Sequence, residues 1–268
     1  MGKRAAEDSN KPAKKRFKNV SKLIDPNTSG IYATCPRRKE SSCRQELMNL
    51  LSDKIPEYFD LSKTNEDDED EDDEKKELSI EDKIKLELEE LKDTKDSKKE
   101  LLQPIELDVE CLIFIKTRKP IDPELLVHKI CKESYETGQK TTRYTQRLMP
   151  IMDTCTIGGD EPLDKIRELA KKVLARHFHN EKDQKPIKFA IQVSKRNFNQ
   201  LQSDGIIKAV AEAVGQNHGH SVDLKTYEKL IIVECYKNSV GIGVADDFLK
   251  FSRFNLQQIY EKQQDEKK

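Results

Sequence analysis

Apolar and polar positions alternate along this chain of 268 residues in two patterns, one typical of strands and one typical of amphipathic helices. In the first half the pattern predicts a strand, a helix, a strand, a helix and a strand at 30–36, 41–55, 105–120, 124–134 and 141–155. In the second half it predicts a helix, a strand, a helix and two strands at 160–178, 188–193, 203–215, 230–235 and 239–246. A short helix near 253–262 follows.

This order, β-α-β-α-β and then α-β-α-β-β, predicts an α+β protein with two units. The first unit, 30–158, suggests a ferredoxin-like layer, and the second, 159–247, a helix-covered sheet beside it. A C-terminal helix and a charged tail occupy 248–268. The glycines of GIGV at 241–244 lie within a strand pattern, which is not the context of a phosphate-binding loop.

The net charge of -1 conceals a segregation of charge along the chain. Residues 66–100 contain 18 Asp/Glu against 8 Lys, and the remainder carries 41 basic against 32 acidic side chains. The consecutive acids at 66–74 repel one another, so we expect an acidic, partly helical insertion at 62–103. This insertion either spaces two parts of the fold or competes for a basic surface.

A basic arm at 1–29, which we expect to be disordered, contains the stretch KPAKKRFK. This stretch resembles a nuclear localisation signal or a phosphate-binding arm. The alternative is a tail that only aids solubility. The arm lacks the apolar centre of a signal peptide, and no apolar run of the chain approaches the roughly 18 residues of a membrane span.

Candidate catalytic groups are missing from the sequence. There is no Gly-rich phosphate loop, and the paired carboxylates that could be nominated as a catalytic acid and base lie in the acidic insertion. The paired histidines lack a Cys or carboxylate at ligand spacing, so we expect surface or packing roles for them and no metal or cofactor: His177, His179, His218 and His220. The six cysteines form no CxxC pair, which indicates reduced thiols in an intracellular protein.

Basic residues gather where predicted strands end. Three predicted strands run into such clusters, and a fourth carries two arginines on its exposed side. The clusters are Arg37 and Arg38 after the first strand, Lys116, Arg118 and Lys119 after the second, and Lys195 and Arg196 after the third; the two arginines are Arg143 and Arg147. If these strand ends converge, they form a surface that contacts several phosphates of a nucleic acid. Phe198, beside Asn197, either stacks on an unpaired base or only anchors its loop. The alternative is that each cluster is an ordinary polar exit from a strand.

Five segments carry a resemblance to a known family: SGIYATCPRRKE, ECLIFIKTRKP, TRYTQRLMPI, FAIQVSKRNFN and VDLKTYEKLIIVECYK. In this order, with the helix and strand pattern from 160 to 246, they resemble the Tan-type THUMP proteins of fungi and the related THUMP-domain proteins of animals. The resemblance runs from Ser29 to Tyr260 and includes the acidic insertion.

The resemblance implies a tRNA-binding adaptor without acetyltransferase chemistry. Such proteins deliver serine and leucine tRNAs to a separate, ATP-using RNA acetyltransferase, which forms 4-acetylcytidine in the D-arm. It also implies that an N-terminal ferredoxin-like domain and the THUMP domain together recognise the acceptor end of tRNA. RNA contacts are then expected first at Lys195, Arg196, Asn197 and Phe198, next at Arg143 and Arg147, and in the neighbouring domain at Arg37, Arg38, Lys116, Arg118 and Lys119.

From these features we expect a monomer in the nucleus or nucleolus, and also in the cytoplasm, with no membrane partner. Two other functions stay open at this point. One is a stand-alone RNA-modifying enzyme, and the other is an RNA-binding protein of ribosome assembly.

Overall fold

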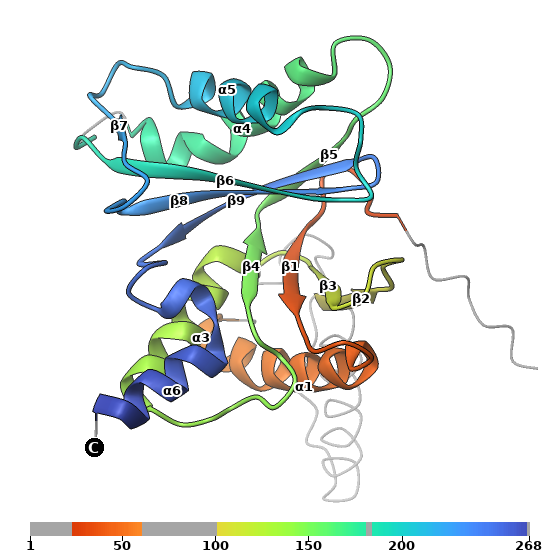
Figure 1. Ribbon diagram of the computed structural model, residues 1–268, viewed down its shortest axis with the longest axis vertical. Helices are drawn as coiled ribbons and strands as arrows, with labels where there is room; N and C mark the ends of the chain where they lie inside the picture. Colours follow the sequence, from red (N-terminus) through yellow and green to blue (C-terminus); the bar gives the residue numbers. More distant parts are fainter. Residues whose placement is uncertain (1–22, 61–100, 181–183, 267–268) are drawn as a thin grey trace, which may run out of the picture.

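The computed structural model describes residues 23–60, 101–180 and 184–266, which form two sheets and five α-helices (Figure 1). The basic arm up to residue 22, the acids at 66–74 and the helix expected within the insertion lie outside the described residues. No helix in the described part is long and apolar enough to cross a membrane.

A four-stranded sheet forms the first layer. Its elements are, in chain order, β1 (Ser29–Thr34), α1 (Glu40–Tyr58), β2 (Leu102–Ile105), β3 (Leu112–Thr117), α3 (Pro123–Thr137) and β4 (Leu148–Ile151). The strand order is β2-β3-β1-β4, and every neighbouring pair is antiparallel. α1 buries Cys43, Leu47, Leu51 and Ile55 in the core beneath this sheet, at the helical spacing predicted from the sequence.

A five-stranded sheet forms the second layer. Its elements are β5 (Asp153–Thr156), α4 (Pro162–Phe178), β6 (Lys188–Arg196), α5 (Ser203–Val214), β7 (Ser221–Val222), β8 (Lys229–Tyr236) and β9 (Ser239–Asp246). The strand order is β5-β9-β8-β6-β7, with β6 parallel to β7 and β8 and the other pairs antiparallel. α4 and α5 cover the face that points away from the first sheet (Figure 1). The chain then continues through η2 (Ser252–Phe254) and α6 (Leu256–Glu266).

One bent strand joins the two sheets. Only Met152 separates β4 from β5, so the chain changes sheets at this residue. Alternate residues of β8 pack into two different hydrophobic cores, one on each face of the second sheet, because successive side chains of a strand point to opposite faces. Leu230 and Ile232 belong to the core shared with the first sheet, whereas Ile231 and Val233 pack under α4 and α5. The second sheet is therefore covered on both faces.

The long strand expected at 105–120 is only partly confirmed. β3 accounts for its second half, and residues 106–111 form the loop between β2 and β3. β2 itself begins at Leu102, inside the range expected for the acidic insertion. The alternating apolar residues of this loop resemble a strand pattern in the sequence. Leu107 and Val109 pack against the first core, but they do so from a loop and not from a strand.

The strand expected at 141–155 also begins later, at Leu148. The reason lies on α1, where the Glu46 carboxylate accepts the backbone N–H groups of Arg143, Tyr144 and Thr145 at 2.6, 3.0 and 2.7 Å. These N–H groups are satisfied by a side chain instead of by a neighbouring strand. The segment that carries Arg143 is therefore a loop fixed to α1.

Candidate nucleic-acid interface

The ends of the basic strands do not converge on one surface. β1 and β3 are antiparallel, with Ser29 opposite Thr117 and Thr34 opposite Leu112. The cluster after β1 therefore lies at one end of the first sheet, and the cluster after β3 lies at the other. Each cluster forms its own site, and its contacts decide what it can bind.

The cluster at the end of β6, in which Lys195 and Arg196 are the last two residues of the strand, is engaged by the protein itself. Lys195 Nζ donates to the Leu201 carbonyl oxygen at 2.9 Å, and the Asn197 side-chain amide donates to the Asp108 carbonyl oxygen at 3.3 Å. Phe198 is 2% exposed and belongs to the core under α4 and α5. Of the two roles considered for this ring, the structure supports the anchoring of the loop.

Arg196 on β6 forms an ion pair with Glu234 on the neighbouring strand β8, on the face of the second sheet that packs against the first. Glu234 is 1% exposed, and burial raises the pKa of its carboxyl group although Arg196 and Arg147 act to lower it. Removing one partner of a buried ion pair leaves an uncompensated charge, which is strongly destabilising. Arg196 therefore stabilises the junction of the sheets, whether or not it also contacts RNA.

The cluster after β1 lies beside carboxylates. Arg37 Nε is 2.8 Å from Glu110 Oε2 in an exposed ion pair. Arg38 and Arg44 line a depression of about 330 Å³, which is also lined by the carboxylates Glu40, Glu106, Asp108 and Glu110. These acids offset the positive charge at this end of the sheet, so it attracts a polyanion less than the basic residues alone would suggest.

The cluster after β3 lines a cavity of about 550 Å³ where the two sheets meet, which we call the basic cleft. Lys116, Arg118 and Lys119 come from the first sheet and its following loop, and Lys172 and Arg176 come from α4. Among the described residues, no ion pair involves Lys116, Arg118 or Lys119. Lys172 pairs at 2.5 Å with Asp153, which also lines the cleft, and Arg176 pairs with Asp122. The cations available for an anionic ligand are therefore Lys116, Arg118 and Lys119.

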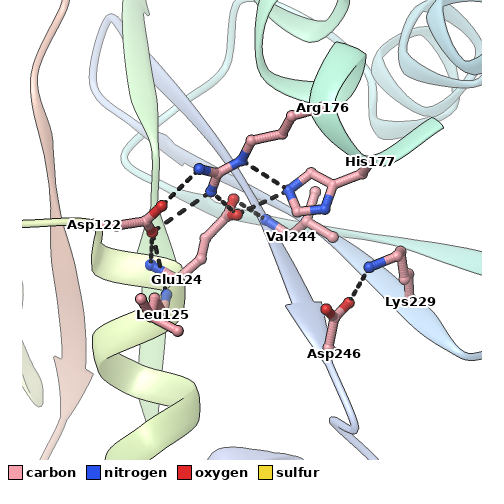
Figure 2. A network of polar contacts seen from close by, with 8 residues as sticks. All are labelled: Asp122, Glu124, Leu125, Arg176, His177, Lys229, Val244 and Asp246. Carbon is pink, nitrogen blue, oxygen red and sulfur yellow. Dashed lines mark hydrogen bonds and ion pairs between the residues drawn. The ribbon is translucent and has the colours of Figure 1, made fainter. Parts of the chain in front are cut away.

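A polar network beside the basic cleft holds α3 against α4 and β9 (Figure 2). Asp122 caps α3 by accepting the Glu124 N–H at 2.9 Å, and it pairs with Arg176 at 2.6 Å. Glu124 is 7% exposed; its carboxylate pairs with Arg176 and His177 and accepts the Val244 N–H at 2.7 Å. Burial raises the pKa of Asp122, but the Arg176 hydrogen bond and the capped N–H groups outweigh burial and lower it. The network thus keeps the Asp122 carboxylate ionised beside Arg176, where the two units meet.

Residues 161–245, which run from α4 to β9, match the family model of the THUMP domain. The Saccharomyces cerevisiae protein named tRNA acetyltransferase TAN1 is 43% identical over 275 residues, covering 96% of this chain and 93% of the relative. The chain belongs to the TAN1 family.

Animal relatives extend this family. The mouse protein named THUMP domain-containing protein 1 is 27% identical over 269 residues, covering 98% of this chain and 74% of the relative. The Drosophila melanogaster THUMP domain-containing protein 1 homolog is 30% identical over 276 residues, covering 97% of this chain and 82% of the relative. The resemblance noted from the sequence segments is confirmed.

The THUMP domain supplies cleft residues that the sequence pattern does not single out. Lys172 and Arg176 are four residues apart on α4 and therefore share one face of the helix. The sequence does not distinguish these two cations from Lys171, because the solvent-facing side of any amphipathic helix carries lysines and arginines. Only the packing of α4 beside the end of β3 assigns them to the basic cleft.

The two arginines before β4 lie outside the basic cleft of this TAN1-family protein. The Arg143 guanidinium is exposed and lies over the Tyr144 ring, 5.3 Å from its centroid. Arg147 is half-buried at the start of β4 and lines a second, smaller cavity. Their predicted contact with RNA stays a prediction.

Two histidines of this TAN1-family chain, His179 and His220, pack against the backbone. His220 Nδ1 accepts the Ile187 N–H at 3.1 Å, and His220 Nε2 donates to the Phe178 carbonyl oxygen at 2.9 Å. His179 Nε2 lies 3.0 Å from the Ala213 carbonyl oxygen. In the described ranges, no group of three or more His, Cys, Asp or Glu residues is placed to hold a metal ion.

Proposed function

We propose that this protein is a tRNA-binding adaptor for 4-acetylcytidine formation in the D-arm of serine and leucine tRNAs, and that it holds the tRNA for a separate RNA acetyltransferase. The observation that carries this proposal is the basic cleft, in which Lys116, Arg118 and Lys119 have no carboxylate partner among the described residues. Lysine and arginine side chains free of carboxylate partners suit phosphates, because their binding releases the condensed counterions. A relative named tRNA acetyltransferase supports tRNA as the nucleic acid.

The arrangement of potential catalytic groups supports an adaptor more than an enzyme. Gly241 and Gly243 lie in β9, packed against Ile151 and Pro150 of the crossing strand, where a pyrophosphate has no access to them. Burial raises the pKa of the buried Cys35 and Cys235 thiols to about 12, so these thiols are protonated at neutral pH. On this proposal, acetyl transfer belongs to the separate enzyme.

We further propose that residues 30–158 form a ferredoxin-like unit that binds RNA together with the THUMP domain. The chain order β-α-β-β-α-β and the strand order β2-β3-β1-β4 support this assignment. We propose that the protein acts as a monomer in the nucleus or nucleolus, and also in the cytoplasm. The basic stretch KPAKKRFK at 11–18 supports the nuclear location.

Acetylation of unmodified serine tRNA by acetyl-CoA and ATP tests the adaptor role. We expect product only when this protein and the RNA acetyltransferase are both present. Product formed by this protein alone would identify it as the enzyme. Product formed equally well by the acetyltransferase alone would show that no adaptor is needed, and either result contradicts the proposal.

Charge reversal of Lys116, Arg118 and Lys119 to Glu tests the basic cleft. We expect weaker binding of serine tRNA and a weaker dependence on salt, with the slope of log affinity against log salt reduced by about 0.7 to 0.9 for each phosphate that the variant no longer neutralises. A matched control reverses three exposed lysines that do not line the cleft, Lys208, Lys225 and Lys250. Equally weak binding by the two variants would assign binding to overall charge and not to the cleft.

A further inference from the structure

A second cationic cavity lies at the end of the chain, outside residues 161–245 that match the THUMP domain. Its volume is about 390 Å³. Its lining residues come from the residue before β4, from the turn after β9, from η2 and from α6: Arg147, Leu249, Ser252, Arg253, Gln258 and Lys262. Three of these residues are cations and none is a carboxylate. We call it the C-terminal cavity.

The segment that forms this cavity is fixed to the rest of the fold. The Leu256 N–H donates to the Gln146 carbonyl oxygen at 2.8 Å, which attaches the start of α6 to the residue before Arg147. Phe251 and Phe254 are 1% and 0% exposed and anchor the turn between β9 and α6 in the first core. The walls of the C-terminal cavity are therefore held in place by buried contacts.

A left-handed turn places one of the cations. Ser252, Arg253 and Phe254 have φ angles of 51°, 58° and 55°, a region that residues other than glycine rarely adopt in succession. Such a backbone persists only where the surroundings enforce it, and it recurs at ligand-binding sites. Here the two buried phenylalanines enforce it, and the exposed Arg253 between them is brought to the cavity.

Arg147 carries an unsatisfied donor beside a second guanidinium. Its Nε is buried without a hydrogen-bond partner among the described residues. Burial lowers the pKa of Arg147, and the nearby positive charge of Arg253 lowers it further. Glu234 is the nearby carboxylate, but it pairs with Arg196, and no hydrogen bond or ion pair in the described structure joins it to Arg147. Two guanidinium groups held close together in this way favour an anion between them.

We propose that the C-terminal cavity binds one phosphate group of the RNA backbone, at a contact separate from the basic cleft. This proposal rests on the proposed tRNA-binding function. Guanidinium groups match phosphate oxygens in a forked, bidentate geometry, and the Ser252 hydroxyl and the Gln258 amide add neutral donors in the same lining. The C-terminal segment thus becomes part of the RNA-binding surface, together with the THUMP domain and the first unit.

The test replaces Arg253 and Lys262 by Gln in the full chain, because both side chains are exposed and their replacement should leave the fold intact. We expect several-fold weaker binding of serine tRNA, and a salt slope reduced by about 0.7 to 0.9, the contribution of one neutralised phosphate. The matched control, Lys208→Gln with Lys185→Gln, removes the same charge at two exposed lysines that do not line the cavity. Melting temperatures check that all variants fold. Unchanged affinity, or an equally weakened control, overturns the proposal.

A second readout follows the accessibility of Lys262 to an acylating reagent. Bound tRNA should protect Lys262 and leave Lys208 reactive, and equal modification of Lys262 with and without tRNA contradicts the proposal. Inorganic phosphate at constant ionic strength separates the two sources of a phosphate group. If phosphate raises the melting temperature of the wild type but not of the variant, and tRNA does not protect Lys262, the cavity is a small-anion site and the RNA contact is overturned.

The failure of this proposal is distinguishable from the failure of the proposed function. If the wild-type protein does not bind tRNA, both are wrong. If the cleft variant binds tRNA weakly while the Arg253 and Lys262 variant binds like the wild type, only the contact at the C-terminal cavity is wrong.

Discussion

At the scale of single residues, Glu46 shows how one carboxylate positions a predicted contact segment. It accepts the N–H groups of Arg143, Tyr144 and Thr145, which fixes the loop before β4 to α1. Burial raises the pKa of Glu46, but these hydrogen bonds outweigh burial and lower it below its ordinary value. A lowered folded-state pKa gives stability that is complete above the unfolded pKa of about 4.3 and is lost as the pH falls through the folded pKa.

We therefore expect Glu46→Gln to lower the free energy of unfolding by about 1 to 3 kcal/mol at pH 7, because the amide leaves N–H groups poorly satisfied. The difference from the wild type should shrink as the pH falls below about 4, where the wild-type carboxylate becomes protonated. Urea unfolding at pH 7 and at pH 3.5 measures both effects. Glu136→Gln on the exposed side of α3 is the control and should change little. A difference that is independent of pH would show that the charge of Glu46 is not its cause.

At the scale of the elements, the bent strand β4–β5 crosses β9 at two glycines. A Cβ atom on Gly243 would lie 2.2 Å from the Pro150 carbonyl oxygen, and one on Gly241 would lie 2.7 Å from Ile151 Cγ2. No real Cβ approaches a backbone oxygen so closely, so the backbones have to separate if Gly243 gains a side chain. The GIGV glycines thus permit the close approach of the two sheets.

Gly243→Ala should destabilise the fold by about 3 kcal/mol, in the upper range of overpacking substitutions, because a backbone atom cannot move aside as a flexible side chain can. Gly158→Ala is the matched control, since a Cβ there meets nothing within 4 Å, and we expect a change below about 0.5 kcal/mol. Thermal and urea unfolding measure both. A Gly243→Ala protein as stable as the wild type would mean that the two strands separate easily.

Local patterns predict the elements of this fold well and their spatial relations poorly. The apolar stripes of α4 and α5 and the strand β8 are found as expected, because their periodicity lies within a few turns of the chain. The opposite directions of β1 and β3 depend on pairing across the chain, so the separation of their basic ends follows no local signal. The Glu234 partner of Arg196 is likewise 38 residues away, so no local signal shows that this predicted RNA contact is also part of an ion pair between β6 and β8.

At the scale of the whole molecule, the network around Glu124 connects the two units. Glu124 lies on α3, beside the first sheet, whereas Arg176, His177 and Val244 belong to the THUMP domain (Figure 2). Its carboxylate contacts all three and is almost fully buried. Beside the shared core and the bent strand, this side chain therefore contributes to the relative placement of the units, and with it to the shape of the basic cleft that Arg176 lines.

Glu124→Ala should therefore lower the free energy of unfolding by about 3 to 5 kcal/mol, the cost of removing one partner from a buried ion pair. It should also speed amide exchange at Val244, whose N–H no longer has its acceptor. A double-mutant cycle with Arg176→Ala should show a coupling of about 1 to 3 kcal/mol, because the two side chains share one network.

The Lys229–Asp246 pair, drawn in Figure 2, is the control: Asp246 is half-exposed, and Asp246→Ala should cost less than about 1 kcal/mol. If Glu124→Ala costs no more than Asp246→Ala and leaves exchange at Val244 unchanged, the units are held together by their apolar contacts alone. Weaker tRNA binding by a folded Glu124→Ala protein would further show that the placement of the units, and not only the charge of the cleft, determines affinity.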